Sequence, residues 1–333
     1  MSKQLKDKEQ EMNKLTSYII LVGLTLSAGL CSSCSQQKSK DGRTDTYSSG
    51  AISFASDESF SPVIEEEREL FEFVYPDAKI TPIYTSESEA IQMLLDGKVP
   101  MAITSRDFKE GELAHLKATK QFPRTIKFAY DGLALIQNTQ NTDSCISVKD
   151  IRRILNGEVT RWDQIYPGSK NGEITLVFDN PRSSTVHFAE DSILGGKAIT
   201  SKNVSAVKKV DEVIKYVETH RGAIGILGSN WLNDKRDSTN ITFKKGIRPM
   251  AVTKLDVANV ENSFKPYQYY FYNDSYPLVR TLYILLNDTH MGLPTGFSNF
   301  IISQDKGQLI ILKAGLLPAY GRIAIRDVNV TAE

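Results

Sequence analysis

The sequence is short of cysteine and carries no net charge. Three cysteines in 333 residues are too few for a disulfide-stapled scaffold, so the fold must rest on hydrophobic cores. The 40 Lys and Arg residues balance 40 Asp and Glu residues, whereas nucleic-acid-binding proteins usually carry a basic excess, so we expect no nucleic-acid partner. The charge balance does not exclude small anions, which backbone dipoles and hydroxyl groups can hold. The 41% of hydrophobic residues are enough to build a core, and the length of 333 residues suggests about two domains.

The sequence also lacks the common catalytic and metal-binding motifs. It contains no G-x-S-x-G elbow, H-E-x-x-H pair, P-loop or G-x-G-x-x-G turn, and its four histidines lack the spacing of metal ligands. Ser183 and His187 lie four residues apart, as a nucleophile and its base on one helical face would. No acid that would orient the histidine is evident, so we expect His187 to face solvent. We therefore expect no enzymatic activity, no metal and no cofactor.

The first 33 residues are typical of an export signal. Lysines precede the apolar run Tyr18–Leu30, and the small residues and cysteines of CSSCS follow it. The run is shorter than the roughly 20 residues of a membrane-spanning helix, although a short membrane anchor is an alternative. The segment resembles a bacterial lipobox, in which the signal is cut before a cysteine that then receives lipid. We predict lipidation at Cys34, with Cys31 as the alternative, and a polar tether over residues 34–49.

A lipidated N-terminus would place the protein on the periplasmic side of the cell envelope, anchored to a membrane. Acidic residues before Met12 are unusual in an export signal, so translation from Met12 instead of Met1 is an alternative.

The rest of the chain alternates short strands, loops and helices, which predicts an α/β architecture. Four predicted strands lead into loops rich in Ser and Thr. In an α/β sheet the carboxyl ends of the strands gather at one edge, where helix N-termini offer unpaired N–H groups and hydroxyls offer rotatable donors. Converging loops of this kind would form an anion site, although each hydroxyl taken alone could be only a helix cap. The loops are Asp57–Phe60, Thr85-Ser86, Thr104–Arg106 and Asp179–Thr185.

Three local patterns give more specific predictions. Residues Thr125–Asn138 predict a long strand, interrupted at Asp131-Gly132. Ser86 and Glu89 fit a capping box at the start of a helix. The aromatic run Tyr267–Tyr272 predicts a buried strand or an interdomain surface rather than a sugar-stacking site.

Six segments together resemble the phosphate-binding proteins of bacterial high-affinity phosphate ABC transporters, in their lipoprotein form. Each segment is a weak signal alone, but their order and spacing along the chain make the resemblance specific. They are Asp131–Asn138 (DGLALIQN), Ile154–Trp162 (ILNGEVTRW), Ser183–Phe188 (SSTVHF), Gly222–Gly225 (GAIG), Tyr276–Arg280 (YPLVR) and Ser303–Pro318 (SQDKGQ…GLLP).

The resemblance implies a two-lobed periplasmic-binding-protein fold that closes like a clamshell, in which each lobe is a mixed β-sheet flanked by helices. Residues 50–133 and 250–325 would form the first lobe, and residues 134–249 the second. The protein would be a monomer that captures phosphate between its lobes and delivers it to the membrane permease of an ABC importer. The alternatives are another oxyanion or a phosphorylated small molecule in the same fold and, with less support, a phosphohydrolase.

The resemblance also implies a set of ligand-binding residues. They are Ser59, the backbone N–H of Phe60, Ser86, Ser105, Arg106, Ser183, Ser184 and Thr185.

This sequence departs from the family pattern at three positions, and the departures affect the charge of the expected site. Arg106 stands where some members have Asp, Asp179 stands where Arg is usual, and Ser184 replaces a glycine. Phosphate at neutral pH keeps a proton that sulfate lacks, so a buried carboxylate that accepts this proton favours phosphate. Asp179 or Asp57 could be the acceptor, and Arg106 could restore the lost positive charge. Alternatively, Asp179 caps a turn and Arg106 pairs with a surface acid.

Overall fold

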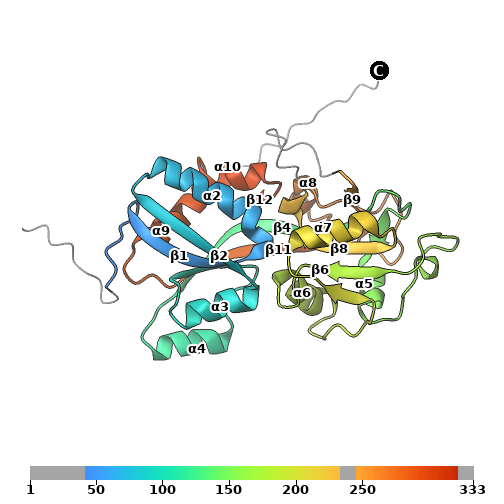
Figure 1. Cartoon of the computed structure of the whole chain (residues 1–333), viewed down its shortest axis with the longest axis horizontal. Coiled ribbons are helices and arrows are strands. Elements are labelled where there is room, and N and C mark those ends of the chain that lie inside the picture. The colour runs from blue at the N-terminus through green and yellow to red at the C-terminus, as the bar shows by residue number, and fades with distance from the viewer. Residues whose placement is uncertain (1–41, 233–244, 322–333) are drawn as a thin grey trace, which may run out of the picture. The chain divides into compact units, whose positions relative to one another are not determined.

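One long strand, β4 (Arg124–Asn138), is shared by the two halves of the sheet (Figure 1). The computed structural model describes residues 42–232 and 245–321, so the predicted signal peptide and both candidate lipidation cysteines lie outside the described residues. Up to Gly132, β4 pairs antiparallel with β11 (Val279–Leu286), and from Leu133 onward it pairs with β8 (Ala223–Gly228). The predicted interruption at Asp131-Gly132 is therefore wrong. The strand is continuous there, and this is the point where it changes its pairing partner.

We call the half on the amino-terminal side of this point the first lobe. Its strands run in the order β2-β1-β3-β11-β4, and the two contacts of β1 are parallel while those of β11 are antiparallel. Helices α2, α9 and α10 pack a core rich in phenylalanine on one face of the sheet, and α3 and α4 cover the other face. The bounds are β1 Gly50–Asp57, β2 Ala78–Thr85, β3 Met101–Thr104, α2 Ser61–Val74, α3 Glu87–Leu95, α4 Glu110–Ala118, α9 Leu293–Ile301 and α10 Gly307–Lys313.

The other half, which we call the second lobe, has its own cores. Its strands run in the order β4-β8-β6-β7, with β9 also on β4, while β5 and β10 form a separate two-stranded sheet. Helix α7 covers one face, and α5 and α6 pack on the other around the buried Trp162. The bounds are β5 Cys145–Ser147, β6 Thr175–Phe178, β7 Val204–Ala206, β9 Ile247–Pro249, β10 Ala251–Thr253, α5 Val148–Leu155, α6 Ser184–Phe188 and α7 Val210–Thr219.

Shorter elements complete the fold. Strand β12 pairs with β4, and a π-helical turn continues α6. The bounds of these shorter elements are η1 Glu58–Phe60, η2 Trp162–Gln164 and η4 Ser229–Trp231 for the 3-10 turns, η3 Ala189–Ile193 for the π-turn, α8 Gln268–Tyr272 and β12 Leu317–Pro318. This mixed sheet with helices on both faces confirms the predicted α/β fold class.

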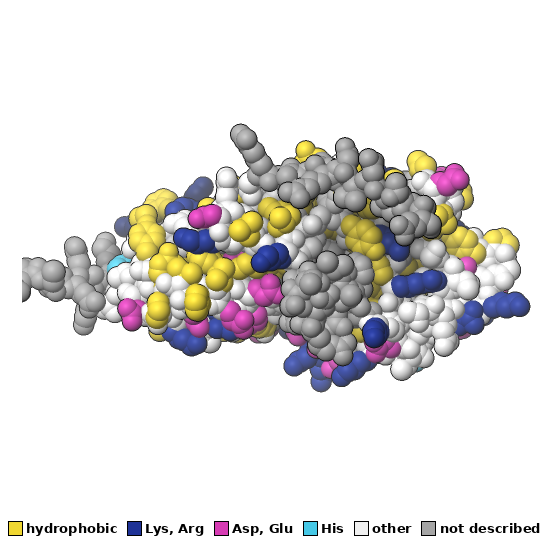
Figure 2. Space-filling model, turned by 90° about the horizontal axis from the view of Figure 1, so that it is seen from above, with side chains coloured by type: hydrophobic (Ala, Val, Ile, Leu, Met, Phe, Trp, Pro, Cys, Tyr) yellow, Lys and Arg dark blue, Asp and Glu magenta, His cyan; other side chains and the backbone are white. Residues whose placement is uncertain are grey.

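The aromatic run Tyr267–Tyr272 corrects a prediction, because it forms helix α8 and not a strand. Phe271 is buried, whereas Tyr269 and Tyr272 are each 54% exposed. Leu309 and Leu312 of α10 are also exposed, and Gln268 at the start of α8 donates to the backbone oxygen of Leu312. Figure 2 shows that hydrophobic side chains reach the surface on this side of the molecule.

The last residues of the predicted tether belong to the compact unit that begins at Asp45 and contains both lobes. The Asp45 carboxylate is buried and accepts the Leu293 backbone N–H at 2.6 Å, at the start of α9. Its backbone oxygen contacts Nε2 of His290 at 2.7 Å. Residues 45–49 are therefore attached to the first lobe.

The partner change in β4 requires a glycine. A Cβ atom at Gly132 would lie 2.3 Å from Cζ of the buried Phe271 ring, which no side-chain contact tolerates. We predict that Gly132→Ala lowers the free energy of unfolding by about 1–3 kcal/mol, the usual cost of overpacking, as measured by urea denaturation. The control is Gly111→Ala in α4, where a Cβ meets no atom within 4 Å. Equal stability of the two variants would contradict the prediction.

Candidate functional site

A chain of hydrogen bonds joins the two lobes where β1 and β6 end. The Ser184 backbone N–H, at the start of α6, donates to Oδ2 of Asp57, the last residue of β1, at 2.9 Å. The hydroxyl oxygens of Ser184 and Ser59 are 3.0 Å apart, and Ser59 Oγ donates to Asp57 Oδ1 at 2.6 Å. The Ser59 backbone oxygen in turn accepts the Trp231 indole N–H of the second lobe at 2.9 Å. The first predicted loop is thus held against the second lobe.

Arg280 supplies the cation at this junction, and it is not among the site residues predicted from the sequence. Its side chain is buried on β11, with Nε and Nη2 at 2.9 and 2.8 Å from Oδ2 of Asp131. Its Nη1 donates to Ser184 Oγ at 2.7 Å and its Nη2 to Ser59 Oγ at 3.4 Å. The guanidinium carbon lies 4.8 Å from the centre of the Phe60 ring. One signal was visible in the sequence, because Arg280 is an isolated charge at an inward position of an otherwise apolar strand.

The direction of each hydrogen bond between Arg280 and Asp57 follows from the chemistry of these two end groups. Arg280 can only donate, and an ionised Asp57 can only accept. Ser184 therefore accepts from Arg280 and donates to Ser59, which donates to Asp57. Because hydroxyls rotate freely, the same donors can be redirected to a bound anion without moving the backbone.

Asp179 gathers the remaining predicted hydroxyls of the second lobe. It directly follows β6, and its Oδ1 accepts from Ser183 Oγ at 2.8 Å and from Thr185 Oγ1 at 2.5 Å. The two hydroxyl oxygens are 2.8 Å apart. The structure thus brings Asp179, Ser183, Ser184 and Thr185 together with Ser59 and Phe60.

Ser86 occupies the N-cap position of α3, but the predicted capping box is wrong. Its hydroxyl makes no cap hydrogen bond, and Glu89 instead accepts from the Thr85 hydroxyl. Within the described residues, Ser86 Oγ is buried without any hydrogen-bond partner. A buried hydroxyl left unpaired costs free energy, so such a group often marks a place where a ligand binds.

The third predicted loop divides between two helices. Ser105 donates through its backbone N–H and its hydroxyl to Glu87 Oε1, at 2.6 and 2.8 Å, so it lies against the first turn of α3. Arg106 forms a two-pronged ion pair with Glu112 of α4, with N–O distances of 2.9 and 2.7 Å. Its guanidinium therefore already has an acidic partner.

From the sequence we expected His187 to face solvent, but its ring contacts two residues of the first lobe. Its Nδ1 lies 2.8 Å from Glu87 Oε2, its Nε2 lies 3.2 Å from Ser88 Oγ, and its side chain is 29% exposed. Glu87 is thus an acid that orients the ring, and it comes from the other lobe. Ser183, by contrast, directs its hydroxyl to Asp179 and to the backbone oxygen of Asn180.

The comparisons with known proteins identify the family. The sequence matches the PBP superfamily domain over residues 40–305. The chain belongs to the PBP superfamily. It is similar to the phosphate-binding protein PstS of Bacillus subtilis (strain 168), with 23% identity over 324 residues that cover 95% of this chain and 98% of the relative. It is similar to PstS of Borreliella burgdorferi with 23% identity over 306 residues, covering 90% and 98%. The resemblance inferred from the six ordered segments is therefore confirmed.

Solved structures show the same fold. A substrate-binding protein from Clostridium perfringens with bound phosphate superposes with a TM-score of 0.67 and 22% identity, over 81% of this chain and all of that chain. An ABC-type phosphate transport receptor from Vibrio cholerae gives a TM-score of 0.60 and 19% identity, over 80% and 99%. These likenesses establish the two-lobed clamshell fold of the PBP superfamily.

Within this PBP fold, the buried carboxyls have unusual proton affinities. Burial, followed by the negative charges of Asp179 and Glu87, raises the pKa of Asp57 to about 6. Burial also raises the pKa of Asp179, against the opposing effect of its hydroxyl donors and of Arg280. The folded chain thus binds protons more tightly than the unfolded chain at Asp57. This contribution to stability is complete below 3.8 and is lost as the pH rises through about 6.

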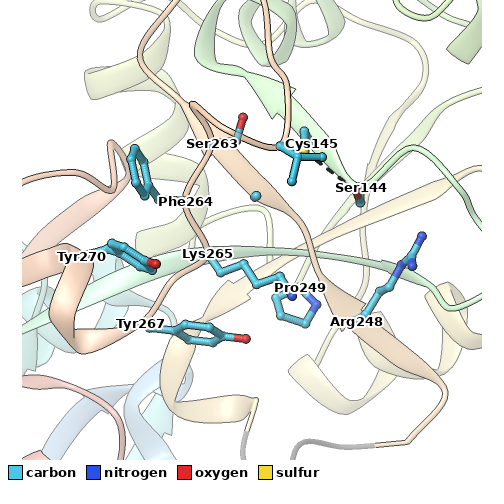
Figure 3. A pocket seen from close by; sticks show the side chains of 11 residues that line it. Ser144, Cys145, Arg248, Pro249, Ser263, Phe264, Lys265, Tyr267 and Tyr270 are labelled. Carbon is cyan, nitrogen blue, oxygen red and sulfur yellow. Dashed lines mark hydrogen bonds between the residues drawn. The ribbon is translucent and has the colours of Figure 1, made fainter. Parts of the chain in front are cut away.

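A separate cavity lies elsewhere in this PBP chain. It has a volume of about 380 Å³ and is lined by residues of β5, β9, β10 and α8 and of the loop before α8. Figure 3 shows the rings of Phe264, Tyr267 and Tyr270 on one side of it and Arg248 on the other. The cavity shares no lining residue with the hydroxyl cluster, the name we use for the side chains of Ser59, Ser183, Ser184 and Thr185. In the described ranges, no group of three or more His, Cys, Asp or Glu could hold a metal ion, and no helix there is long and apolar enough to cross a membrane.

The coupling between the two carboxyls can be tested by pH titration. We predict that Asp179→Asn lowers the pKa of Asp57, because it removes a negative charge, but leaves it above 3.8, because burial is the larger cause. The measurement is the chemical shift of the Asp57 carboxyl carbon across a pH series. Asp163→Asn, at a half-exposed site in the second lobe, is the control. An unchanged Asp57 titration in Asp179→Asn would refute the coupling.

Proposed function

We propose that this protein captures inorganic phosphate between its two lobes and delivers it to the permease of an ABC importer. The observation that carries the proposal is the contact of buried Arg280 with hydroxyls from both lobes, Ser59 and Ser184. An anion bound there would gain a charge-assisted bond from the guanidinium and rotatable donors from two sides. The curated relatives of similar length are named as phosphate-binding proteins, which supports the same ligand here.

The further ligand donors in this proposal come from groups at the same junction. The buried Ser86 hydroxyl has no hydrogen-bond partner among the residues that the structure describes, and the start of α3 adds backbone N–H groups at the positive end of a helix dipole. Phe60 contributes its backbone N–H, as the family resemblance implies. Ser105 contributes its hydroxyl once this turns from Glu87 toward the anion, while the Ser105 backbone N–H continues to hold Glu87 Oε1. Ser183 and Thr185 contribute hydroxyls once these turn from Asp179 toward the anion.

The positive charge that balances the anion comes from Arg280 in this proposal. Both arginines already pair with a carboxylate, Arg280 with Asp131 and Arg106 with Glu112. Arg280 is the better candidate because it is buried and also donates to the hydroxyls of Ser184 and Ser59. Arg280 thus replaces the arginine that other members carry where this chain has Asp179.

Discrimination between phosphate and sulfate follows from the carboxyls. Burial raises the pKa values of both Asp57 and Asp179, and the negative charges of Asp179 and Glu87 raise the pKa of Asp57 further. An ionised carboxylate among them accepts the proton of monohydrogen phosphate, whereas sulfate has no proton to donate and is repelled. The ionised carboxylate repels any fully deprotonated oxyanion in the same way, and this favours phosphate over the alternative ligands.

The proposal places this activity outside the cytoplasm. The N-terminal signal and the cysteine at position 34, with Cys31 as the alternative, would attach the mature chain to a membrane by lipid. The mature protein would act as a monomer, and its loaded, closed form would be the one the permease accepts. A phosphohydrolase remains the competing function. It would release nitrophenolate steadily from p-nitrophenyl phosphate, and we expect none.

Phosphate binding can be separated from stability at Ser86. We predict that Ser86→Ala binds phosphate about tenfold or more weakly by isothermal titration, since a hydrogen bond to a charged ligand is lost, while the free energy of unfolding stays unchanged or rises. Ser298→Ala is the matched control, because Ser298 is a fully buried serine in α9 whose hydroxyl bonds Pro294. Unchanged phosphate affinity in folded Ser86→Ala, or wild-type binding of sulfate in preference to phosphate, would contradict the proposal.

The lipid anchor has its own test. We expect the intact mass of protein extracted from membranes to correspond to a chain that begins at Cys34 and carries acyl groups, because the residues before Cys34 are small. Cys34→Ser should then leave the protein unacylated, while Cys31→Ser should not. Acyl groups on neither cysteine would eliminate this part of the proposal.

A further inference from the structure

A second set of contacts joins the lobes beside the hydroxyl cluster. Glu87 and Ser88 are the first two residues of α3 in the first lobe, and His187 belongs to α6 in the second. The two ring nitrogens of His187 are divided between them, Nδ1 at 2.8 Å from Glu87 Oε2 and Nε2 at 3.2 Å from Ser88 Oγ. Because these residues come from different lobes, the contacts depend on how closely the lobes approach.

Glu87 is held in place to receive this histidine. Its side chain is fully buried, and its Oε1 is occupied by the backbone N–H and hydroxyl of Ser105. Its Oε2 is thereby directed at His187. The imidazole is 29% exposed, so it can exchange protons with solvent.

Among the described residues, Glu87, Asp57 and Arg106 are charged groups that act on the pKa of His187. The contact with Glu87 is the main cause that raises the pKa of His187, and the charge of Asp57 at the end of β1 adds to it. Partial burial and the positive charge of Arg106, which follows β3, oppose the rise. Glu87 correspondingly has a lowered pKa, through the bonds from His187 and Ser105 against the effect of its own burial.

We propose that Glu87, Ser88 and His187 form an interlobe latch, in which a proton on His187 strengthens the closed arrangement of the lobes. This latch rests on the proposed capture of phosphate between the lobes and adds a pH dependence to it. In neutral His187, Nδ1–H donates to Glu87 and Nε2 accepts from Ser88. In protonated His187 both nitrogens donate, and the bond to Glu87 becomes a charge-assisted one of about twice the strength.

The direction of the pH effect follows from the raised pKa. The stabilisation of the closed form is complete below the ordinary histidine value of 6.5 and is lost as the pH rises through the raised value. The latch therefore adds most to capture in mildly acidic surroundings, and its contribution falls as the pH rises.

The test compares the phosphate affinity of three proteins by isothermal titration across a pH series. They are the wild type, His187→Gln, and a matched control, His115→Gln, in which an exposed histidine of α4 is replaced. The ratio of dissociation constants between variant and wild type cancels the ionisation of phosphate itself. We expect His187→Gln to bind about three- to tenfold more weakly near pH 6, with a ratio that shrinks toward alkaline pH. The His115→Gln ratio should stay near unity throughout.

If His187→Gln binds phosphate more weakly by the same factor at every pH, the latch is overturned, because the proton on His187 would then play no part. Absence of phosphate binding by the wild type would instead defeat the proposed function. In that case the latch is decided by the His187 ring titration, followed by NMR in the wild type and in Glu87→Gln. A lower His187 pKa in Glu87→Gln supports the latch, and an unchanged value overturns it.

Discussion

The buried ion pair between Arg280 and Asp131 is the interaction on which the rest of the site depends. The two residues face each other across the β4–β11 ladder, at the point where β4 passes from one lobe to the other. A buried pair is tolerated only when its remaining donors and acceptors are satisfied. Here the second Asp131 oxygen accepts the backbone N–H and hydroxyl of Ser229, and the guanidinium reaches Ser184 and Ser59. The ion pair thus links five segments, namely β4, β11, η1, α6 and the start of η4.

The junction holds more acid than base, which gives it a proton chemistry. Asp57, Asp179 and Glu87 lie close to one another, with Arg280 and His187 as the nearby cations. Burial raises the pKa values of both aspartates, and the neighbouring negative charges of Asp179 and Glu87 raise the pKa of Asp57 further. Glu87 escapes this effect because His187 and Ser105 donate to it. Phosphate recognition and the proposed latch therefore both depend on the protonation of neighbouring groups. The aspartates lie within the site, and Glu87 and His187 lie at its rim.

The sequence predicted the α/β class, and the resemblance predicted the two-lobed clamshell, because strand and helix patterns are local and the six motifs keep their order. It also selected loops that the fold does bring together, at Ser59, Ser184 and Asp179. It failed where the answer lay in long-range pairing. Asp131 read as a break in a strand because its partner is 149 residues away at Arg280. The aromatic run at Tyr267–Tyr272 read as a strand because composition cannot distinguish a short helix from a strand.

The sequence by itself determined the export signal pattern, the hydroxyl-rich loops and the family resemblance, since each depends on neighbouring residues and their order. Only the tertiary structure decided which cation serves the site. Arg106 and Arg280 are equally good cations in the sequence, but Arg106 finds Glu112 six residues away, while strand pairing buries Arg280 among the hydroxyls. The same holds for His187, whose orienting acid is supplied by the other lobe. Electrostatic partners across 100 residues or more are chosen by the packing of the sheet, and no local pattern records that choice.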